Sequence, residues 1–167
     1  NHVYFCECAA NTGMEWAGAQ LNGAQFTHGM IHNMEYTGVP LRLLLEEASY
    51  DPAGKWVYVE GADASSNGRS IPMEKALDDC LVAFKMNGED IPRDHGYPLR
   101  AILPGHVGVR NSKWLKRVSV QPQEAQSVWQ QSDYKFFPPW ATKPDPSLPS
   151  VQYMPVQSSV TSATFDT

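Results

Sequence analysis

The sequence predicts an α+β domain, in which short strands alternate with short helices. Three patterns indicate this class: apolar residues at helical spacing after Pro40, segments at 55–60 and 115–120 that alternate apolar and polar residues, and an Asn-Gly turn at 87–88. With 167 residues, 42% of them hydrophobic, the chain is long enough to bury the core of one domain.

Most of the predicted elements begin or end at a recognisable residue. Pro40 suits the first turn of a helix, and apolar residues then recur on one helical face. Gly61 ends a strand, Pro72 begins a second helix, and Pro104 ends a later apolar strand. We expect strands at residues 3–9, 55–60, 80–86, 98–103 and 115–120, helices at 40–49, 72–79 and 123–132, and irregular structure at 10–38.

The C-terminal part of the chain has a different composition. It turns rich in proline after Phe137 and ends in serine and threonine residues, which is typical of an extended connector rather than of a second core. We therefore divide the chain into a domain at 1–136 and a connector at 137–167. The domain opens on what reads as a strand already under way, so we expect it to be N-terminally incomplete.

Charge narrows the classes of partner. The net charge is −5, which argues against a general nucleic-acid binder, and no apolar run approaches the roughly 20 residues that span a bilayer. Between residues 93 and 117, however, six cationic side chains accompany one acid, Asp94. This cationic block indicates either a small anionic ligand such as a phosphate or a solvated basic strand edge, and charge alone does not decide between them. Its members are Arg93, Arg100, Arg110, Lys113, Lys116 and Arg117.

The three cysteines do not indicate a disulfide framework, because their number is odd and small. Cys8 falls where a strand opens into a loop, and a thiolate there could bind a soft or high-valent metal. A free cysteine is more commonly a small buried hydrophobe, and Cys8 alone favours that interpretation. His28 and His32 could share a helix face and bind a metal, but Gly29 weakens a helix there and favours a structural role.

Two segments carry more specific motifs. The first is Glu7-Cys8-Ala9-Ala10-Asn11, and the second runs through residues 84–120, followed in order by Asp133-Tyr134-Lys135 and by 155–158. Together these segments resemble the sulfite oxidase family, and the likeness covers almost the whole chain. The family's core signature matches Met86-Asn87-Gly88, Arg93-Asp94-His95-Gly96-Tyr97-Pro98-Leu99-Arg100, Pro104-Gly105 and Lys113-Trp114-Leu115.

The resemblance implies the family's fold, here a partial sulfite-oxidase-type molybdopterin-binding domain of mixed sheets and short helices. In that family the molybdenum carries a dithiolene, oxo groups and one cysteine thiolate, which the resemblance places at Cys8. Tyr134 matches the active-site tyrosine near the oxo group. Arg100 and Lys113 would hold the cofactor phosphate and so account for the cationic block. The implied pterin contacts are Asp63, His95, Arg100, Asn111, Ser112 and Lys113.

The implied activity is oxidoreduction. An oxygen atom passes from molybdenum to a sulfur substrate, with sulfite to sulfate favoured, and electrons leave to a cytochrome-type haem protein. Thr12 and Gly13 stand where sulfite oxidases have two arginines, and residues 11–41 resemble the catalytic subunit of bacterial sulfane dehydrogenase, which oxidises protein-bound sulfur. Oxidation of protein-bound sulfur and a non-catalytic scaffold are therefore the alternatives.

The resemblance also implies the surroundings of this domain. The connector at 137–167 would lead to a C-terminal immunoglobulin-like domain that forms a homodimer, and haem would belong only to a partner or to another domain. The family's compartments are the periplasm and the mitochondrial intermembrane space. We expect no nucleic-acid partner and no membrane span.

Overall fold

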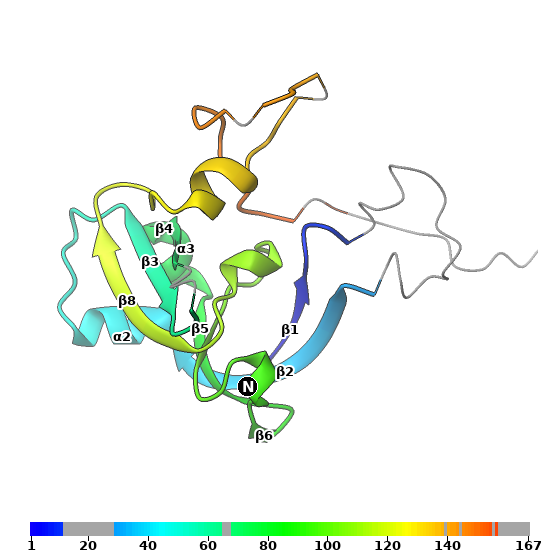
Figure 1. Cartoon of the computed structure of the whole chain (residues 1–167). Coiled ribbons are helices and arrows are strands. Elements are labelled where there is room, and N and C mark those ends of the chain that lie inside the picture. The colour runs from blue at the N-terminus through cyan, green and yellow to red at the C-terminus, as the bar shows by residue number, and fades with distance from the viewer. Residues whose placement is uncertain (12–28, 65–67, 139, 144, 155, 157–167) are drawn as a thin grey trace, which may run out of the picture.

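The computed structural model describes residues 1–11, 29–64, 68–138, 140–143, 145–154 and 156 of the chain. Within these residues, two sheets and a few short helices form the body of the molecule (Figure 1). Every strand pairing between the described strands is antiparallel. The predicted α+β class is confirmed.

The first sheet has five strands, in the order β1-β2-β5-β6, with β7 also paired to β5. The predicted tight turn at Asn87 and Gly88 joins β5 to β6, and the φ angles of these residues, 53° and 81°, are the positive values that such a hairpin turn requires. A shift of register between Thr37 and Gly38 marks an irregularity in β2. The strands are β1 (His2–Glu7), β2 (Ile31–Pro40), β5 (Leu81–Met86), β6 (Glu89–Asp90) and β7 (Arg100–Ile102).

The second sheet has three strands in the order β4-β3-β8. Among the described residues, both α-helices begin directly after a proline that ends a strand, as predicted at Pro40 and Pro72. No helix in the described part of the chain is long and apolar enough to cross a membrane. The remaining elements are α2 (Leu41–Glu47), β3 (Trp56–Gly61), β4 (Gly68–Pro72), α3 (Met73–Asp78), η2 (Arg93–His95), η3 (Gly108–Arg110), β8 (Leu115–Gln121) and η4 (Trp129–Asp133).

The core lies on both faces of β5, because successive side chains of a strand point to opposite sides. On one face Val82 belongs to a buried cluster with Val57 of β3 and Leu45 of α2. On the other face Leu81 belongs to a second cluster with Tyr36 of β2. The central strands of the first sheet are therefore fixed from both sides, and the side chains that they carry toward the candidate site stand on rigid elements.

Three expectations differ from the structure. Residues 31–38, predicted to be irregular, belong to the ten-residue strand β2. The side chains of His32, Met34 and Tyr36 alternate along this strand and are more buried than Ile31 and Asn33. Polar residues between them and Gly38 hide this alternation in the sequence. Strand β4 was not predicted, and the helix expected at 123–132 is only the short turn η4. Residues 12–28, with His28, lie outside the described part.

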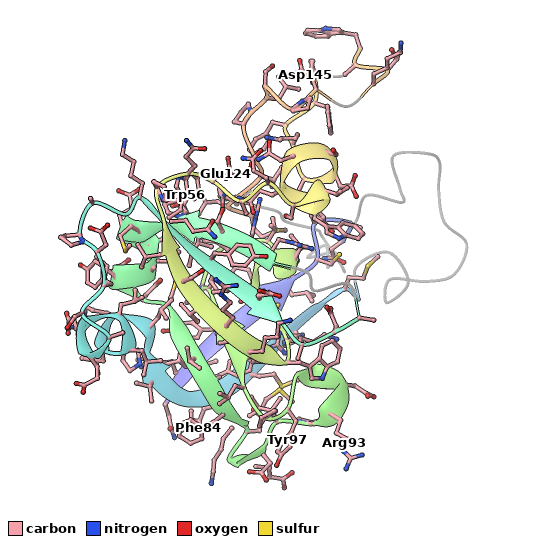
Figure 2. The ribbon with its side chains drawn as sticks, turned by 60° about the vertical axis from the view of Figure 1, so that its left-hand side comes forward. Trp56, Phe84, Arg93, Tyr97, Glu124 and Asp145 are labelled. Carbon is pink, nitrogen blue, oxygen red and sulfur yellow. The ribbon has the colours of Figure 1, made fainter. Side chains whose placement is uncertain are left out.

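The segment after residue 136 returns to the body of the domain. Before it returns, the segment extends away from the domain, and Figure 2 shows Asp145 on this extended part. The Val151 backbone N–H donates to the Tyr134 carbonyl (2.8 Å), and the Met154 N–H donates to the Gly105 carbonyl (2.9 Å). The described part of this segment thus contacts the domain at several points. The boundary at residue 136 stays a prediction.

Candidate functional site

Cys8 lies one residue beyond the end of β1, at the start of a tightly held loop. Its backbone N–H donates to the Met30 carbonyl (2.9 Å), and its carbonyl accepts from the Asn11 N–H (2.9 Å). The buried Asn11 side chain joins the two sides of the loop, because its Nδ2 donates to Glu7 Oε1 (2.8 Å) and its Oδ1 accepts from the Met30 N–H (3.1 Å). The backbone around the Cys8 thiol is therefore fixed before any ligand binds.

The thiol of Cys8 faces a cavity of about 510 Å³, which we call the thiol cavity. Its walls come from segments far apart in the sequence, since β1, β2, β7 and the residues after β8 all contribute. Two cations and two thiols meet here with one phenol. The polar lining residues used below are Cys6, Cys8, His32, Arg100, Lys113 and Tyr134.

A smaller cavity of about 160 Å³, the side cavity, adjoins the thiol cavity. Asp63, Arg69, Ser112 and Lys113 line it, and four residues line both cavities. Their common wall is formed by Gly108, Val109, Asn111 and Lys113. A ligand larger than either cavity could therefore extend along this wall from one to the other.

Arg100 is held in the floor of the thiol cavity with only 3% of its surface exposed. One guanidinium nitrogen donates to the His95 carbonyl (2.9 Å), and the guanidinium lies 5.8 Å from the centre of the Tyr36 ring. The Arg100 Nε is buried and finds no hydrogen-bond partner among the described residues. A buried charged donor of this kind is costly unless a ligand accepts from it, which makes Arg100 a natural partner for an anionic group.

The segment from η2 to Arg100 wraps around Lys113. The Lys113 ammonium donates to the Asp94 carbonyl (2.8 Å) and lies 4.4 Å from the centre of the Trp114 ring. Gly96 has a φ of 111°, and a β-carbon there would come within 2.9 Å of the Lys113 Cα, so only glycine fits. His95 meets His32 edge to face at 6.2 Å between ring centres.

Asn111 and Ser112 are both buried at the wall between the cavities. The Asn111 carboxamide is engaged by the protein, because its Oδ1 accepts from the Leu103 N–H (2.7 Å) and its Nδ2 donates to the Val107 carbonyl (3.4 Å). The Ser112 carbonyl accepts from the Ala101 N–H (2.9 Å). These bonds attach the wall to β7 and fix its position beside Arg100.

Tyr134 closes the thiol cavity from the side of η4. Its ring lies 6.3 Å from that of Trp129, and its backbone N–H donates to the Trp129 carbonyl (3.1 Å). Burial raises the pKa of the Tyr134 hydroxyl, and the negative charge of a Cys8 thiolate raises it further. The tyrosine therefore keeps its proton and can act as a hydrogen-bond donor.

The other two titratable groups of the thiol cavity respond to burial in the same way. Burial raises the pKa of the Cys6 thiol, although the nearby Arg100 opposes this shift. Burial also lowers the pKa of His32, and the charge of Arg100 lowers it further. Cys6 and His32 therefore favour their neutral forms, which leaves Arg100 as the main charge in this part of the cavity.

Arg69 is a residue of the site that sequence reasoning missed. It belongs to β4, has 2% of its surface exposed, and lines the side cavity. Its guanidinium lies 5.5 Å from the centre of the Trp129 ring, and Asp63 lines the same cavity. Burial lowers the pKa of Arg69. The segment Gly68-Arg69-Ser70 has no signal for a buried strand, so its sequence did not reveal this cation.

A buried polar network fixes η4, and with it Tyr134, against β4. Gln130 is fully buried, and its Oε1 accepts from the Ser70 N–H (3.0 Å) while its Nε2 donates to the Ser70 carbonyl (3.1 Å). Arg110 also donates to Gln130 Oε1. The Ser70 hydroxyl accepts from the Ala125 N–H (2.8 Å). The Gln130 carboxamide therefore joins η4 to both β4, through Ser70, and η3, through Arg110.

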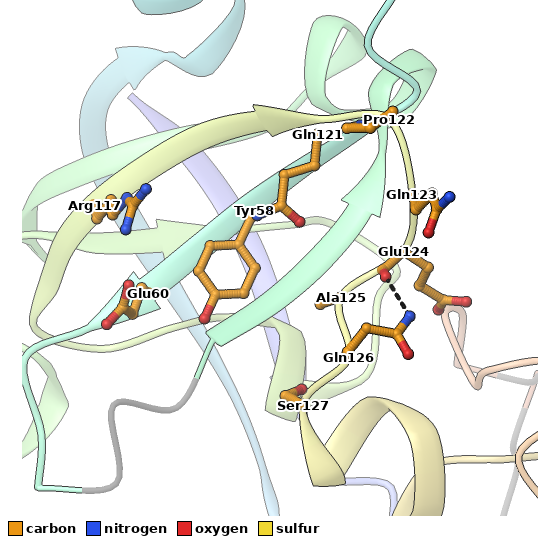
Figure 3. A pocket seen from close by; sticks show the side chains of 10 residues that line it. All are labelled: Tyr58, Glu60, Arg117, Gln121, Pro122, Gln123, Glu124, Ala125, Gln126 and Ser127. Atoms are coloured by element: carbon orange, nitrogen blue, oxygen red, sulfur yellow. Dashed lines mark hydrogen bonds between the residues drawn. The ribbon is translucent and has the colours of Figure 1, made fainter.

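The members of the cationic block have separate roles. Arg110 is internal and donates twice to the Val151 carbonyl (3.2 and 2.7 Å), and Lys116 pairs with Glu60 (2.8 Å). Arg93 is exposed and points away from the body (Figure 2). Arg117 lines an open hollow of about 640 Å³ on another face, between β3, β8 and residues 121–127 (Figure 3).

The hollow in Figure 3 contains none of the predicted site residues. Of the cationic block, Arg100 and Lys113 line the thiol cavity. The structure therefore brings together Cys8, Tyr134, Arg100, Lys113 and Asn111 around that cavity, with Asp63 and Ser112 along the side cavity. His95 does not line either cavity, but its carbonyl accepts from Arg100 and its ring contacts that of His32, both of which line the thiol cavity.

These residues fit the family's cofactor. A thiol on a loop held by hydrogen bonds suits a high-valent metal, and the cations Arg100 and Lys113, with the unsatisfied Nε of the buried Arg100, suit the anionic groups that molybdopterin carries. Two connected cavities provide room for a ligand with a metal end and an extended organic part. Both the lining residues and the size of the cavities are therefore compatible with a bound molybdopterin cofactor.

The chain belongs to the oxidoreductase molybdopterin binding domain family, whose model matches residues 1–129. It is 51% identical to the sulfane dehydrogenase SoxCD from Paracoccus pantotrophus, whose crystal structure matches with a TM-score of 0.84 over 92% of this chain and 38% of that chain. It is 40% identical to mitochondrial sulfite oxidase of Homo sapiens over 168 residues, which cover 93% of this chain and 31% of the relative. Sulfite oxidase of Gallus gallus gives 40% identity over 93% of this chain and 37% of the relative.

The chain thus spans about a third of the length of these relatives. The predicted family, the fold and the molybdopterin cofactor are confirmed. The roles of individual residues, which no comparison tests, stay predictions.

Proposed function

We propose that this domain is the catalytic centre of a molybdenum-dependent oxidoreductase that oxidises a sulfur substrate, with sulfite the favoured substrate. One observation carries the proposal. The Cys8 thiol, the Tyr134 phenol and the cations Arg100 and Lys113 line one cavity, although they come from distant parts of the chain. A metal ligand, a hydrogen-bond donor and an anion-binding wall are the parts that such chemistry requires.

The cofactor, when bound, supplies oxygen-atom transfer and takes up the two electrons released. Cys8 would hold the metal, because its loop is fixed by the Asn11 and Met30 hydrogen bonds. Arg100 and Lys113 would hold the cofactor's anionic group. Asp63, His95, Asn111 and Ser112 would complete the pterin contacts, with Asn111 contributing its backbone because its carboxamide is already engaged.

Tyr134 would orient the substrate. Its hydroxyl remains protonated because burial and the Cys8 charge raise its pKa, so it donates a hydrogen bond to an oxygen of the substrate. The Gln130 network holds η4 in place and so limits the movement of Tyr134. A donor that is positioned in advance stabilises developing negative charge without reorganisation.

Oxidation of protein-bound sulfur is the second candidate. The 51% identity with the sulfane dehydrogenase SoxCD, above the 40% with human sulfite oxidase, favours it, as do Thr12 and Gly13. A non-catalytic scaffold is less compatible with a site that keeps a thiol, a phenol and two cations in one cavity. A cytochrome-type acceptor, a homodimer and a periplasmic or mitochondrial location belong to the same proposal.

Purified protein, produced in a host that makes molybdopterin, tests the proposal. We expect molybdenum in the preparation and reduction of cytochrome c that depends on sulfite. A higher kcat/KM with a thiol-carrier protein bearing sulfane sulfur than with sulfite would select the second candidate. Bound molybdenum without turnover of either substrate would contradict both and support a scaffold.

A further inference from the structure

We propose that Arg69 is a specificity-determining residue: it binds the anionic oxygen group of the substrate beside Tyr134. The inference rests on the proposed function and names the group that recognises the substrate. It concerns a residue outside both the cysteine motif and the cationic block.

Arg69 belongs to β4 of the second sheet, whereas Arg100 belongs to β7 of the first sheet. Strand β4 carries Arg69 in register with Val59 of β3, and the side chain is 2% exposed, so its charge is directed into the protein. It lines the side cavity, which shares the wall of Gly108 and Val109 with the thiol cavity. Arg69 therefore lines the side cavity and Arg100 lines the adjoining thiol cavity, and the two cations come from different sheets.

The surroundings of Arg69 hold its guanidinium in one orientation. One nitrogen donates to the Gly68 carbonyl (2.9 Å), and the planar group lies 5.5 Å from the centre of the Trp129 ring. A guanidinium has five N–H donors in a fixed fan, an arrangement that matches the paired oxygens of an oxyanion. Trp129 is the first residue of η4, and Tyr134 directly follows the last one. Because the rings of Trp129 and Tyr134 also contact each other, Trp129 connects the Arg69 guanidinium to the Tyr134 phenol.

Ring contacts connect Arg69 to Tyr134. The Arg69 guanidinium lies 5.5 Å from the centre of the Trp129 ring, and the Trp129 ring lies 6.3 Å from that of Tyr134. Tyr134 in turn lines the thiol cavity together with Cys8. A small anion beside the Tyr134 phenol would therefore lie on the side of the thiol cavity that is nearer to this cation.

The ligand class that fits is a small oxyanion of sulfur. A guanidinium pairs its parallel N–H groups with two oxygens of one anion, and a phenol can donate to a further oxygen. Free sulfite and the oxidised sulfur end of a carrier thiol share this chemistry. Both would meet the same two groups, Arg69 and Tyr134.

The test compares Arg69→Met, which keeps the length of the side chain and removes its charge, with Arg69→Lys, which keeps the charge and removes the fan. Arg117→Met is the matched control, since Arg117 is an exposed arginine in the other hollow. The holoproteins are assayed for sulfite turnover, for sulfate binding by titration calorimetry and for molybdenum content.

We expect Arg69→Met to raise the KM for sulfite roughly tenfold to a hundredfold, the range for loss of a charge-assisted hydrogen bond, with kcat much less affected. The Kd for sulfate should rise by a similar factor, Arg69→Lys should fall between, and molybdenum content should match that of Arg117→Met. The thiol-carrier assay distinguishes the two sources of the oxyanion, because the KM of the true substrate shows the larger change.

Three results would overturn the inference. An unchanged KM and sulfate Kd in Arg69→Met would show that the cation does not meet the anion. A molybdenum content that falls with Arg69→Met would place the residue among the cofactor contacts. Equal loss of kcat in Arg69→Lys and Arg69→Met, with KM unchanged, would mean that Arg69 only supports Trp129. If wild-type protein turns over neither substrate, the proposed function fails, while the sulfate Kd still decides the role of Arg69.

Discussion

His106 is a buried histidine whose ionisation should weaken the fold in acid. Only 1% of its surface is exposed, and neither ring nitrogen has a hydrogen-bond partner among the described residues. Its ring meets that of Tyr153 at 4.5 Å between centres. The pKa of His106 is lowered from 6.5 to about 4, first by burial and then by the charges of Lys75 and Arg110, against a smaller opposite effect of Asp79.

The sign and size of the effect follow from this shift. The unfolded chain binds a proton at His106 below pH 6.5, whereas the folded protein does so only near pH 4, so stability falls as pH decreases through this window. Each pKa unit corresponds to about 1.4 kcal/mol. The loss attributable to His106 is therefore about 2 kcal/mol at pH 5 and about 3 kcal/mol at pH 4 and below.

Urea unfolding of wild type and His106→Leu at pH 7.5, 6 and 5 measures this term. We expect the wild type to lose about 2 kcal/mol more than His106→Leu between pH 7.5 and pH 5, since leucine has a similar size and no proton to bind. His2→Gln, at an exposed histidine, is the control and should follow the wild type. Parallel losses in wild type and His106→Leu would refute the reasoning, because they would place the acid-sensitive group elsewhere.

Two further substitutions test the supports of the site. Asn11→Ala removes the carboxamide that joins Glu7 to Met30, so we expect a loss of about 1–3 kcal/mol in unfolding free energy and less molybdenum bound per protein. A normal molybdenum content would show that metal binding does not depend on these hydrogen bonds. Gln130→Ala leaves Ser70 and Arg110 with buried groups unpaired, so we expect at least about 2 kcal/mol of destabilisation in urea unfolding together with reduced kcat; a stability change below about 0.5 kcal/mol would contradict the described network.

Local sequence signals predicted the elements that local rules govern. Helix α2 follows from Pro40 and its apolar repeat, the β5–β6 hairpin from Asn87-Gly88, and β8 from its alternation. Strand β2 was missed because Gly38 and several polar residues interrupt its pattern, although it is paired on both sides by β1 and β5. Long-range pairing, which sequence periodicity does not report, stabilises that strand.

The same distinction holds for the candidate site. Cys8, Tyr134, Arg100 and Lys113 could be selected from motifs, and the fold brings all four to one cavity. Arg69 could not, because an arginine in a short polar segment looks exposed until β4 pairs with β3 and buries it. The Gln130 network likewise joins residues 60 positions apart, a relation that only the folded chain reveals.

The metal ligand is the central claim, and X-ray absorption at the molybdenum K edge tests it most directly. Cys6→Ser is the matched control, because Cys6 lines the same cavity two residues away. We predict that Cys8→Ser holoprotein has one sulfur neighbour fewer around molybdenum than the wild type, whereas Cys6→Ser keeps the full number. An unchanged sulfur shell in Cys8→Ser, or a sulfur lost in Cys6→Ser instead, would contradict the account.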